Sequence, residues 1–107
     1  MYRIILTETA IAHYNAFVKS GNVKIINKIK LLLADIAQHP YTGIGKPEAL
    51  KYSLTGMWSR RINREHRIIY SIDDDRIIVH ILARHSHYGA KWINGEDGIA
   101  RSLRFIA

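Results

Sequence analysis

Residues 57–83 read MWSRRINREHRIIYSIDDDRIIVHILA, and this stretch decides the fold. Isoleucine, valine and aromatic residues recur at every second position in residues 67–72 and 76–83, and Trp58 and Ile62 share one parity in residues 57–63, which predicts three β-strands. The run Asp73-Asp74-Asp75 is a polar turn between the second and third of them. Because both connections are short, we expect a meander of antiparallel strands.

Two helices precede this meander. Residues 2–6 form a short apolar run that predicts a strand, and Thr7 and Asn22 are good N-cap residues for the segments that follow. Gly21 and Pro40 fit the ends of those segments. Within each segment the apolar residues are three and four positions apart, so each predicts an amphipathic helix, and the short connection makes the helices antiparallel neighbours. The apolar positions are Ala10, Ile11, Tyr14, Phe17 and Val18, then Ile25, Ile26, Ile29, Leu32, Leu33 and Ile36.

These elements predict an α+β fold in which two N-terminal helices pack on one face of an antiparallel, twisted sheet. Residues 42–47 contain Gly43 and Gly45 and are expected to be a loop. Tyr52 and Leu54 suggest another short strand before a turn at Gly56. The sheet face away from the helices would carry arginines and remain open for a ligand.

Length and charge restrict the possible functions. The chain of 107 residues is long enough for a single core. Its net charge of +7 favours a polyanionic partner, nucleic acid above all, although a basic protein without such a ligand is the simple alternative. The chain has no cysteine, which favours a cytoplasmic location, and no apolar run reaches the roughly 18 residues needed to span a membrane.

Glu48 is a candidate proton acceptor. It follows the glycine-rich loop and lies between Lys46 and Lys51. A carboxylate next to cations can take a proton from a bound substrate while the cations hold its phosphate. The alternative is an ordinary solvated glutamate.

Arginines are dense just after Gly56. Arg60 and Arg61 must point to opposite faces if they lie in one strand, so only one of them can serve a site on the open face. Arg67 shares its face with Ile69 and Ser71, where its guanidinium could hold a phosphate through two hydrogen bonds. Arg64 adds a fourth positive charge. The alternative is a charged sheet edge that resists aggregation.

A histidine pair follows the last predicted strand. His85 or His87 could donate a proton to a leaving oxygen at neutral pH, and Tyr88 could stack on a base. A metal site is disfavoured because no acidic ligand or cysteine accompanies these histidines, so no metal or other cofactor is expected. For residues 89–107 the spacing of Ile99, Leu103 and Ile106 allows a short helix, with a frayed tail as the alternative.

Three motifs together resemble a known family. The chain contains G-I-G-K-P-E-A-L-K, then G-M-W-S-R-R-I-N-R-E-H-R-I-I-Y, and finally H-Y. They resemble the Txe/YoeB branch of the RelE-like toxins of toxin–antitoxin systems over roughly residues 25–88, which implies the RelE-like microbial ribonuclease fold. Residues 1–88 would then form the toxin domain and residues 89–107 a C-terminal extension that the family usually lacks.

The resemblance implies a ribosome-dependent endoribonuclease that cleaves mRNA in the A site of the 30S subunit. It implies a YefM/Phd-like antitoxin as partner, allows a homodimer and involves no membrane. By position, Glu48 resembles the general base, Arg67 the phosphate-stabilising arginine, and Lys51 and Arg61 cations that contact the substrate. His87 and Tyr88 resemble the terminal acid and the base-contacting tyrosine.

The histidine end of the motif is ambiguous. The interval between the aspartate turn and H-Y is about two residues longer than the family pattern, and an ungapped alignment selects His85 instead of His87. Tyr88 favours His87, because it completes the H-Y pair. Two other functions stay open: a basic module that binds RNA or the ribosome without cutting, and an inactive toxin homologue that serves as an antitoxin partner.

Overall fold

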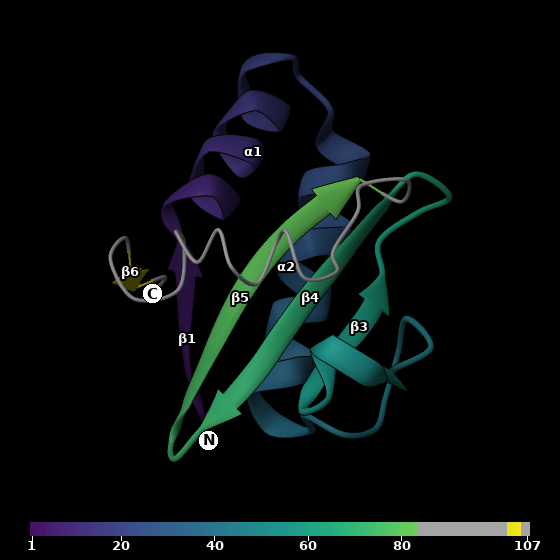
Figure 1. Ribbon diagram of the computed structural model, residues 1–107. Coiled ribbons are helices and arrows are strands. Elements are labelled where there is room, and N and C mark those ends of the chain that lie inside the picture. Colours follow the sequence, from purple (N-terminus) through teal and green to yellow (C-terminus); the bar gives the residue numbers. More distant parts are fainter. Residues whose placement is uncertain (84–102, 106–107) are drawn as a thin grey trace.

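The computed structural model describes residues 1–83 and the strand Leu103–Phe105. Strand β1 (Arg3–Thr7) leads into helices α1 (Glu8–Lys19) and α2 (Val23–Gln38). The rest of the described chain is the short strand β2 (Glu48–Ala49), the 3₁₀ turn η1 (Tyr52–Leu54), and strands β3 (Met57–Arg61), β4 (His66–Asp73), β5 (Arg76–Ala83) and β6 (Leu103–Phe105). The predicted α+β fold is confirmed (Figure 1).

Both helices begin where the sequence predicts. The side-chain oxygen of Thr7 accepts a hydrogen bond from the backbone N–H of Ala10, at 3.2 Å, and that of Asn22 accepts one from Ile25, at 3.3 Å. Each bond satisfies a helix N–H that would otherwise lack a partner. Neither helix is long and apolar enough to cross a membrane, within the part of the chain that the structure describes.

The strands of the described chain form one sheet in the order β2-β3-β4-β5-β1-β6. The meander from β2 to β5 is antiparallel, as expected. Strand β1 joins it differently, because it pairs with β5 in parallel, with Ile4 opposite Ile77. A parallel neighbour needs a long crossover, and here β1 and β5 are separated in sequence by both helices and three strands of the sheet.

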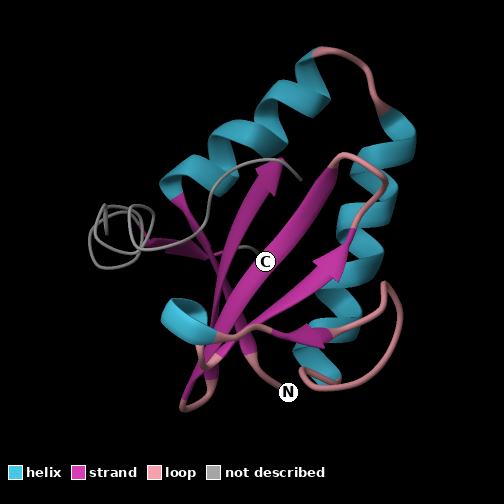
Figure 2. Ribbon diagram, turned by 45° about the vertical axis from the view of Figure 1, so that its right-hand side comes forward, coloured by secondary structure: helices cyan, strands magenta, loops and turns pink. Residues whose placement is uncertain are grey.

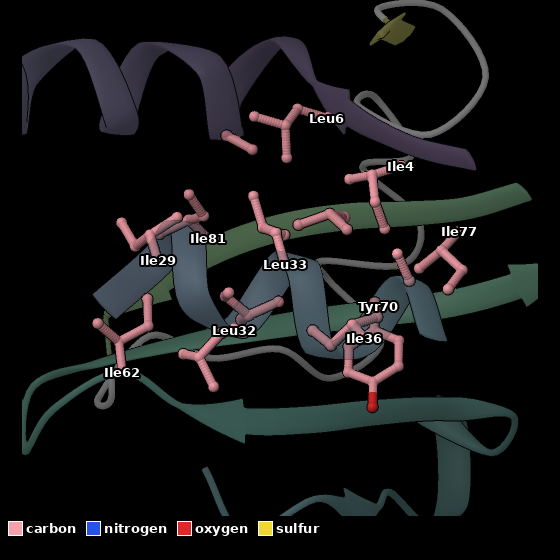
Figure 3. Packing of buried hydrophobic residues seen from close by; sticks show 14 residues of the cluster. Ile4, Leu6, Ile29, Leu32, Leu33, Ile36, Ile62, Tyr70, Ile77 and Ile81 are labelled. Atoms are coloured by element: carbon pink, nitrogen blue, oxygen red, sulfur yellow. The ribbon is translucent and has the colours of Figure 1, made fainter. Parts of the chain in front are cut away.

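The core lies between the helices and one face of the sheet, where α2 passes behind β4 and β5 in Figure 1. Its side chains are mainly isoleucine and leucine, and each fully buried one contributes about 1.5–3 kcal/mol to stability. Figure 3 shows Tyr70 beside Ile36 at one edge of this cluster, with its hydroxyl oxygen pointing away from the aliphatic side chains. The buried core residues labelled there are Ile4, Leu6, Ile29, Leu32, Leu33, Ile36, Ile62, Tyr70, Ile77 and Ile81.

The prediction of a strand at Tyr52 and Leu54 is wrong. These residues form η1, and Tyr52 has a φ of 58°, a left-handed conformation that a strand cannot contain. The turn folds over the sheet so that Leu54 is buried against Met57 and Ile69, on the face opposite the long helices (Figure 2). A turn of this kind can also place apolar residues at alternate positions, so the alternation alone does not distinguish it from a strand. The pairing strand is Glu48–Ala49 instead.

The C-terminal segment also differs from expectation. Residues Leu103–Phe105 form an edge strand antiparallel to β1, with Phe105 opposite Ile5. A helix through Leu103 is therefore wrong. The predictions that concern Ile99 and Ile106 lie outside the described residues.

His80 makes stability sensitive to acid. It lies in β5 with only 3% of its surface exposed, and burial lowers its pKa to about 4. In the unfolded chain its pKa is about 6.5. Between these two values the unfolded chain binds the additional proton, so the free energy of unfolding falls as the pH drops from about 6.5 to about 4.

We expect His80→Gln to remove this contribution to the pH dependence of stability. The slope of the free energy of unfolding against pH should decrease by at most about 1.4 kcal/mol per pH unit. Denaturant unfolding between pH 4 and 7 measures it. His13→Gln, at an exposed position of α1, is the matched control and should retain the wild-type slope. Equal slopes in the His80 variant and the wild type would contradict the assignment.

Candidate RNA-cleavage site

Arg60 is the central anchor of the loop that leads to Glu48. The side chain is fully buried and its guanidinium makes five hydrogen bonds. Nη1 donates to Asp35 Oδ2 at 2.6 Å and Nε to the hydroxyl of Tyr70 at 3.0 Å. The other bonds reach backbone carbonyls of the loop, at 2.9 Å, 2.5 Å and 2.8 Å for Ile44, His39 and Thr42 in turn.

Asp35 and Tyr70 complete this network, which we name the Arg60 clamp (Arg60, Asp35 and Tyr70). The guanidinium beside Asp35 lowers the pKa of that carboxyl group, and Asp35 also accepts the backbone N–H of Ile44 at 3.2 Å. Burial raises the pKa of Tyr70, whose hydroxyl donates to the carbonyl of Pro40 at 2.5 Å. Side chains from α2, β3 and β4 thus bond the loop backbone at four residues, His39, Pro40, Thr42 and Ile44.

Two glycines let the loop approach this closely. A Cβ atom at Gly43 would lie 1.9 Å from Asp35 Oδ2, and one at Gly45 would lie 2.7 Å from Leu32 Cδ2. Both residues also have positive φ angles, 124° and 78°. Glycine at these two positions therefore lets the loop backbone lie directly against Asp35 and Leu32.

The structure does not support the prediction that Arg60 contacts RNA. Every donor direction of its guanidinium is used inside the protein, and the side chain has no exposed surface. The parity argument holds, because Arg61, its neighbour in β3, is exposed on the opposite face.

The sheet face opposite the helices is named the open face here, and its central residues are Ser59, Arg61, Arg67, Ile69 and His80. They alternate with residues of the helix-facing core, so they point the other way. Arg61 is exposed and Arg67 partly exposed, whereas Ser59, Ile69 and His80 are buried, so the expectation of an open face holds only near the two arginines. Ile69 and the neighbouring turn η1 cover the part nearest Met57. The part nearest Arg61 and Arg67 is the more polar one.

Arg61 and Arg67 lie directly opposite each other on β3 and β4. Such a pair has Cβ atoms about 4.5–5.5 Å apart, and two like charges at this spacing destabilise a sheet unless an anion joins them. Neither arginine forms an ion pair within residues 1–83. The acidic turn Asp73–Asp75 lies at the far end of β4 from Arg67, so this end of the sheet stays positive.

Glu48 is placed on the same face. It pairs with Ser59 across β2 and β3, and directly opposed residues of antiparallel strands share a face. Arg61 is the next residue of β3 on that face, about 8 Å from Glu48 between Cα atoms by strand geometry. The side chain of Glu48 is exposed and free to meet a substrate. A carboxylate and two guanidinium groups can therefore surround one phosphodiester.

The other predicted cations surround this group. Lys46 lies beside Arg61, because the carbonyl of Gly45 accepts the N–H of Arg61 at 2.8 Å. Lys51 is exposed at the start of η1, and Arg64 is exposed in the connection between β3 and β4. His85, His87 and Tyr88 lie outside the described residues. Among the residues that the structure does describe, no cluster of three or more histidine, aspartate or glutamate side chains could hold a metal ion.

A groove of about 540 Å³ lies elsewhere, at the beginning of α2. None of the predicted site residues lines it, and its wall is formed by Asn22, Lys24, Ile25, Asn27, Lys28, Leu31, Ile62 and Asn63. It is therefore separate from the open face.

Comparison with known proteins identifies the family. Residues 6–88 match the family described as the YoeB-like toxin of bacterial type II toxin–antitoxin systems. The chain belongs to this YoeB-like toxin family. The RelE-like fold and the resemblance in the three sequence motifs are thus confirmed.

Individual YoeB proteins agree with this placement. The chain is 44% identical over 77 residues to Toxin YoeB from Synechocystis, which covers 72% of this chain and 88% of that protein. A YoeB dimer from Staphylococcus aureus superposes with a TM-score of 0.70 at 40% identity, covering 79% of this chain and 98% of the other. The YoeB–YefM complex from the same organism gives 0.68 at 39% identity, with coverages of 81% and 99%.

For this YoeB-like toxin we expect Arg60→Met to lower the free energy of unfolding by about 3–5 kcal/mol, because it breaks a buried ion pair and leaves loop carbonyls without donors. Arg61→Met is the matched control: the same change one residue along, at an exposed side chain, should alter stability by less than about 0.5 kcal/mol. Denaturant unfolding compares them. Similar losses in both variants would contradict the clamp.

Proposed function

We propose that this YoeB-like toxin is an endoribonuclease that cleaves mRNA in the A site of the 30S ribosomal subunit. The observation that supports it best is the grouping of Glu48 with Arg61 and Arg67 on one face of the sheet. A module that only binds phosphate needs the two arginines but has no need of a carboxylate, which repels RNA. The carboxylate therefore favours cutting over binding.

The cleavage uses the ribose next to the scissile phosphate. Glu48 takes the proton of the 2′-OH, and the resulting oxygen attacks the adjacent phosphorus while the bond to the 5′-oxygen of the next nucleotide breaks. Arg67 and Arg61 stabilise the negative charge that builds on the phosphoryl oxygens. The products are a 2′,3′-cyclic phosphate and a free 5′-hydroxyl.

The leaving 5′-oxygen needs a proton donor. His87 is proposed for this role, with His85 as the alternative, and Tyr88 is proposed to contact a base. Lys46, Lys51 and Arg64 would hold neighbouring phosphates of the message. Arg60 is left out of the site because the clamp occupies it. The chemistry is carried by side chains, without a metal ion or cofactor.

A YefM/Phd-like antitoxin is the proposed partner. The solved Staphylococcus aureus relatives support this, since one is a YoeB–YefM complex and another a YoeB dimer. A homodimer of this chain is proposed on the same ground. Because its substrate is a translated message, the protein would act in the cytoplasm. Residues 89–107 are proposed to extend the toxin domain of residues 1–88.

Cleavage should depend on the open-face residues when the toxin is induced in growing bacteria and new ends of translated messages are mapped. Glu48→Gln removes the proton acceptor and should reduce cleavage by about 10²–10⁴-fold. Arg67→Met should reduce it by about 10²–10³-fold, because a stabiliser of the developing charge is lost. Separate His85→Gln and His87→Gln variants identify the proton donor.

The control for this series is Lys30→Met, which removes an exposed charge on α2 and should leave cleavage unchanged. Full cleavage by Glu48→Gln would overturn the assignment of the base. Growth arrest with intact messages would support the non-cutting binding module instead, and neither arrest nor cleavage would indicate an inactive homologue.

A further inference from the structure

Tyr52 is a second unusual residue near the open face, and none of the sequence motifs drew attention to it. It is 90% exposed, the largest exposed fraction of any aromatic side chain among residues 1–83. It also has a left-handed backbone, with a φ of 58°. For a bulky residue this conformation costs about 1–3 kcal/mol and persists only where the surroundings enforce it.

The surroundings do enforce it. The carbonyl of Tyr52 accepts two hydrogen bonds from Thr55, at 2.7 Å from Oγ1 and 3.1 Å from the backbone N–H. On one side Leu50 donates its N–H to the carbonyl of Met57 at 2.9 Å, and on the other Leu54 is buried against Met57 and Ile69. The turn is held at both ends, so the ring projects from a fixed base.

The position of this ring relates it to the cleavage site. Tyr52 is four positions after Glu48 in the sequence, so their Cα atoms are at most about 14 Å apart. Lys51 precedes it directly and is exposed. The two non-glycine residues with left-handed backbones on this side of the sheet, Lys46 and Tyr52, flank strand β2, which carries Glu48.

An aromatic face beside cations suits a nucleotide. A base stacks on the ring, and the positive side chains hold its phosphate, as in sites for single-stranded RNA. A contiguous apolar patch around the ring would instead indicate a protein contact. Among residues 1–83 the other large exposed apolar residues are Met1, Val18, Val23 and Leu31 on or before the helices, and Tyr41 and Ile44 in the loop before β2, so none of them belongs to η1.

We propose that Tyr52 is a stacking platform for a base of the bound message, next to the nucleotide that is cut. The proposal rests on the proposed ribonuclease function and adds a recognition residue to it. Stacking on one aromatic ring is worth about 1–3 kcal/mol per base, and 1.4 kcal/mol corresponds to tenfold in affinity. The ring is held outward by the backbone strain of η1 so that it is available before RNA arrives.

Tyr52→Gly tests this without damage to the fold. Glycine adopts the left-handed conformation at no cost, so the variant should be at least as stable as the wild type while it loses the ring. We expect about tenfold less cleavage of ribosome-bound mRNA. Tyr52→Phe and Tyr52→Trp keep an aromatic face and should stay within about threefold of the wild type. Leu31→Ala, an exposed position on α2, is the control.

A binding measurement separates this proposal from the proposed catalysis. In a Glu48→Gln background, ribosomes are programmed with a short message that carries 2-aminopurine in the A-site codon. Stacking on Tyr52 should quench its fluorescence, and Tyr52→Gly should abolish the quenching. This readout does not require cleavage, so it remains decisive even if the wild type cuts nothing.

Two results would overturn the proposal. The first is cleavage by Tyr52→Gly equal to that of the wild type, with fluorescence quenching also unchanged when Tyr52→Gly is added to Glu48→Gln, while Glu48→Gln alone does not cleave. The ribonuclease function would then stand without the platform. The other is normal cleavage by Tyr52→Gly together with escape from antitoxin neutralisation, which would assign the ring to a protein contact.

Discussion

The buried guanidinium of Arg60 is the interaction on which the rest of the structure depends. It joins α2 through Asp35, β4 through Tyr70 and three carbonyls of the loop between His39 and Ile44. A charge with no exposed surface is costly unless every donor is bonded, and here every donor is. The segment that precedes Glu48 therefore has one arrangement, which is set by the core and not by the loop itself.

This anchoring explains how a surface carboxylate can have a defined place. Gly45 is bonded to the backbone of Arg61, and Glu48 then pairs with Ser59 on the same strand. The two consecutive arginines of β3 thus have different positions. Arg60 holds the loop on the helix-facing side of the sheet, while Arg61 is exposed on the open face. Catalytic groups require positions fixed to within fractions of an ångström, and a strand supported by the core supplies them better than a free loop.

Much of this arrangement could be predicted from sequence, because it follows from periodicity. The helix caps at Thr7 and Asn22, the meander and the opposite orientations of Arg60 and Arg61 all depend on local rules that the chain obeys. The parity rule could not tell which arginine faces inward, since an arginine in a core is rare without bonded partners, and those of Arg60 lie up to 25 residues away.

The errors have a common origin in long-range contacts. Tyr52 and Leu54 alternate like strand residues, but Leu54 is drawn onto Met57 and Ile69, which turns the chain and leaves Tyr52 outside. Likewise, no local signal indicates that β1 pairs in parallel with β5. Arg60 and Tyr52 depend most on such contacts, and their places in the fold differ most from those that the sequence predicts.

The claim that the open face cuts RNA through the ribose can be measured directly. Ribosomes are programmed with two messages that differ only in a 2′-OH or a 2′-deoxy group at the mapped cleavage nucleotide, and the product ends are determined. Our account predicts cleavage of the first message alone, leaving a 2′,3′-cyclic phosphate that can open to a 3′-phosphate. Cleavage of the deoxy message, or a product with a 5′-phosphate, would contradict it, because water and not the ribose would then be the nucleophile.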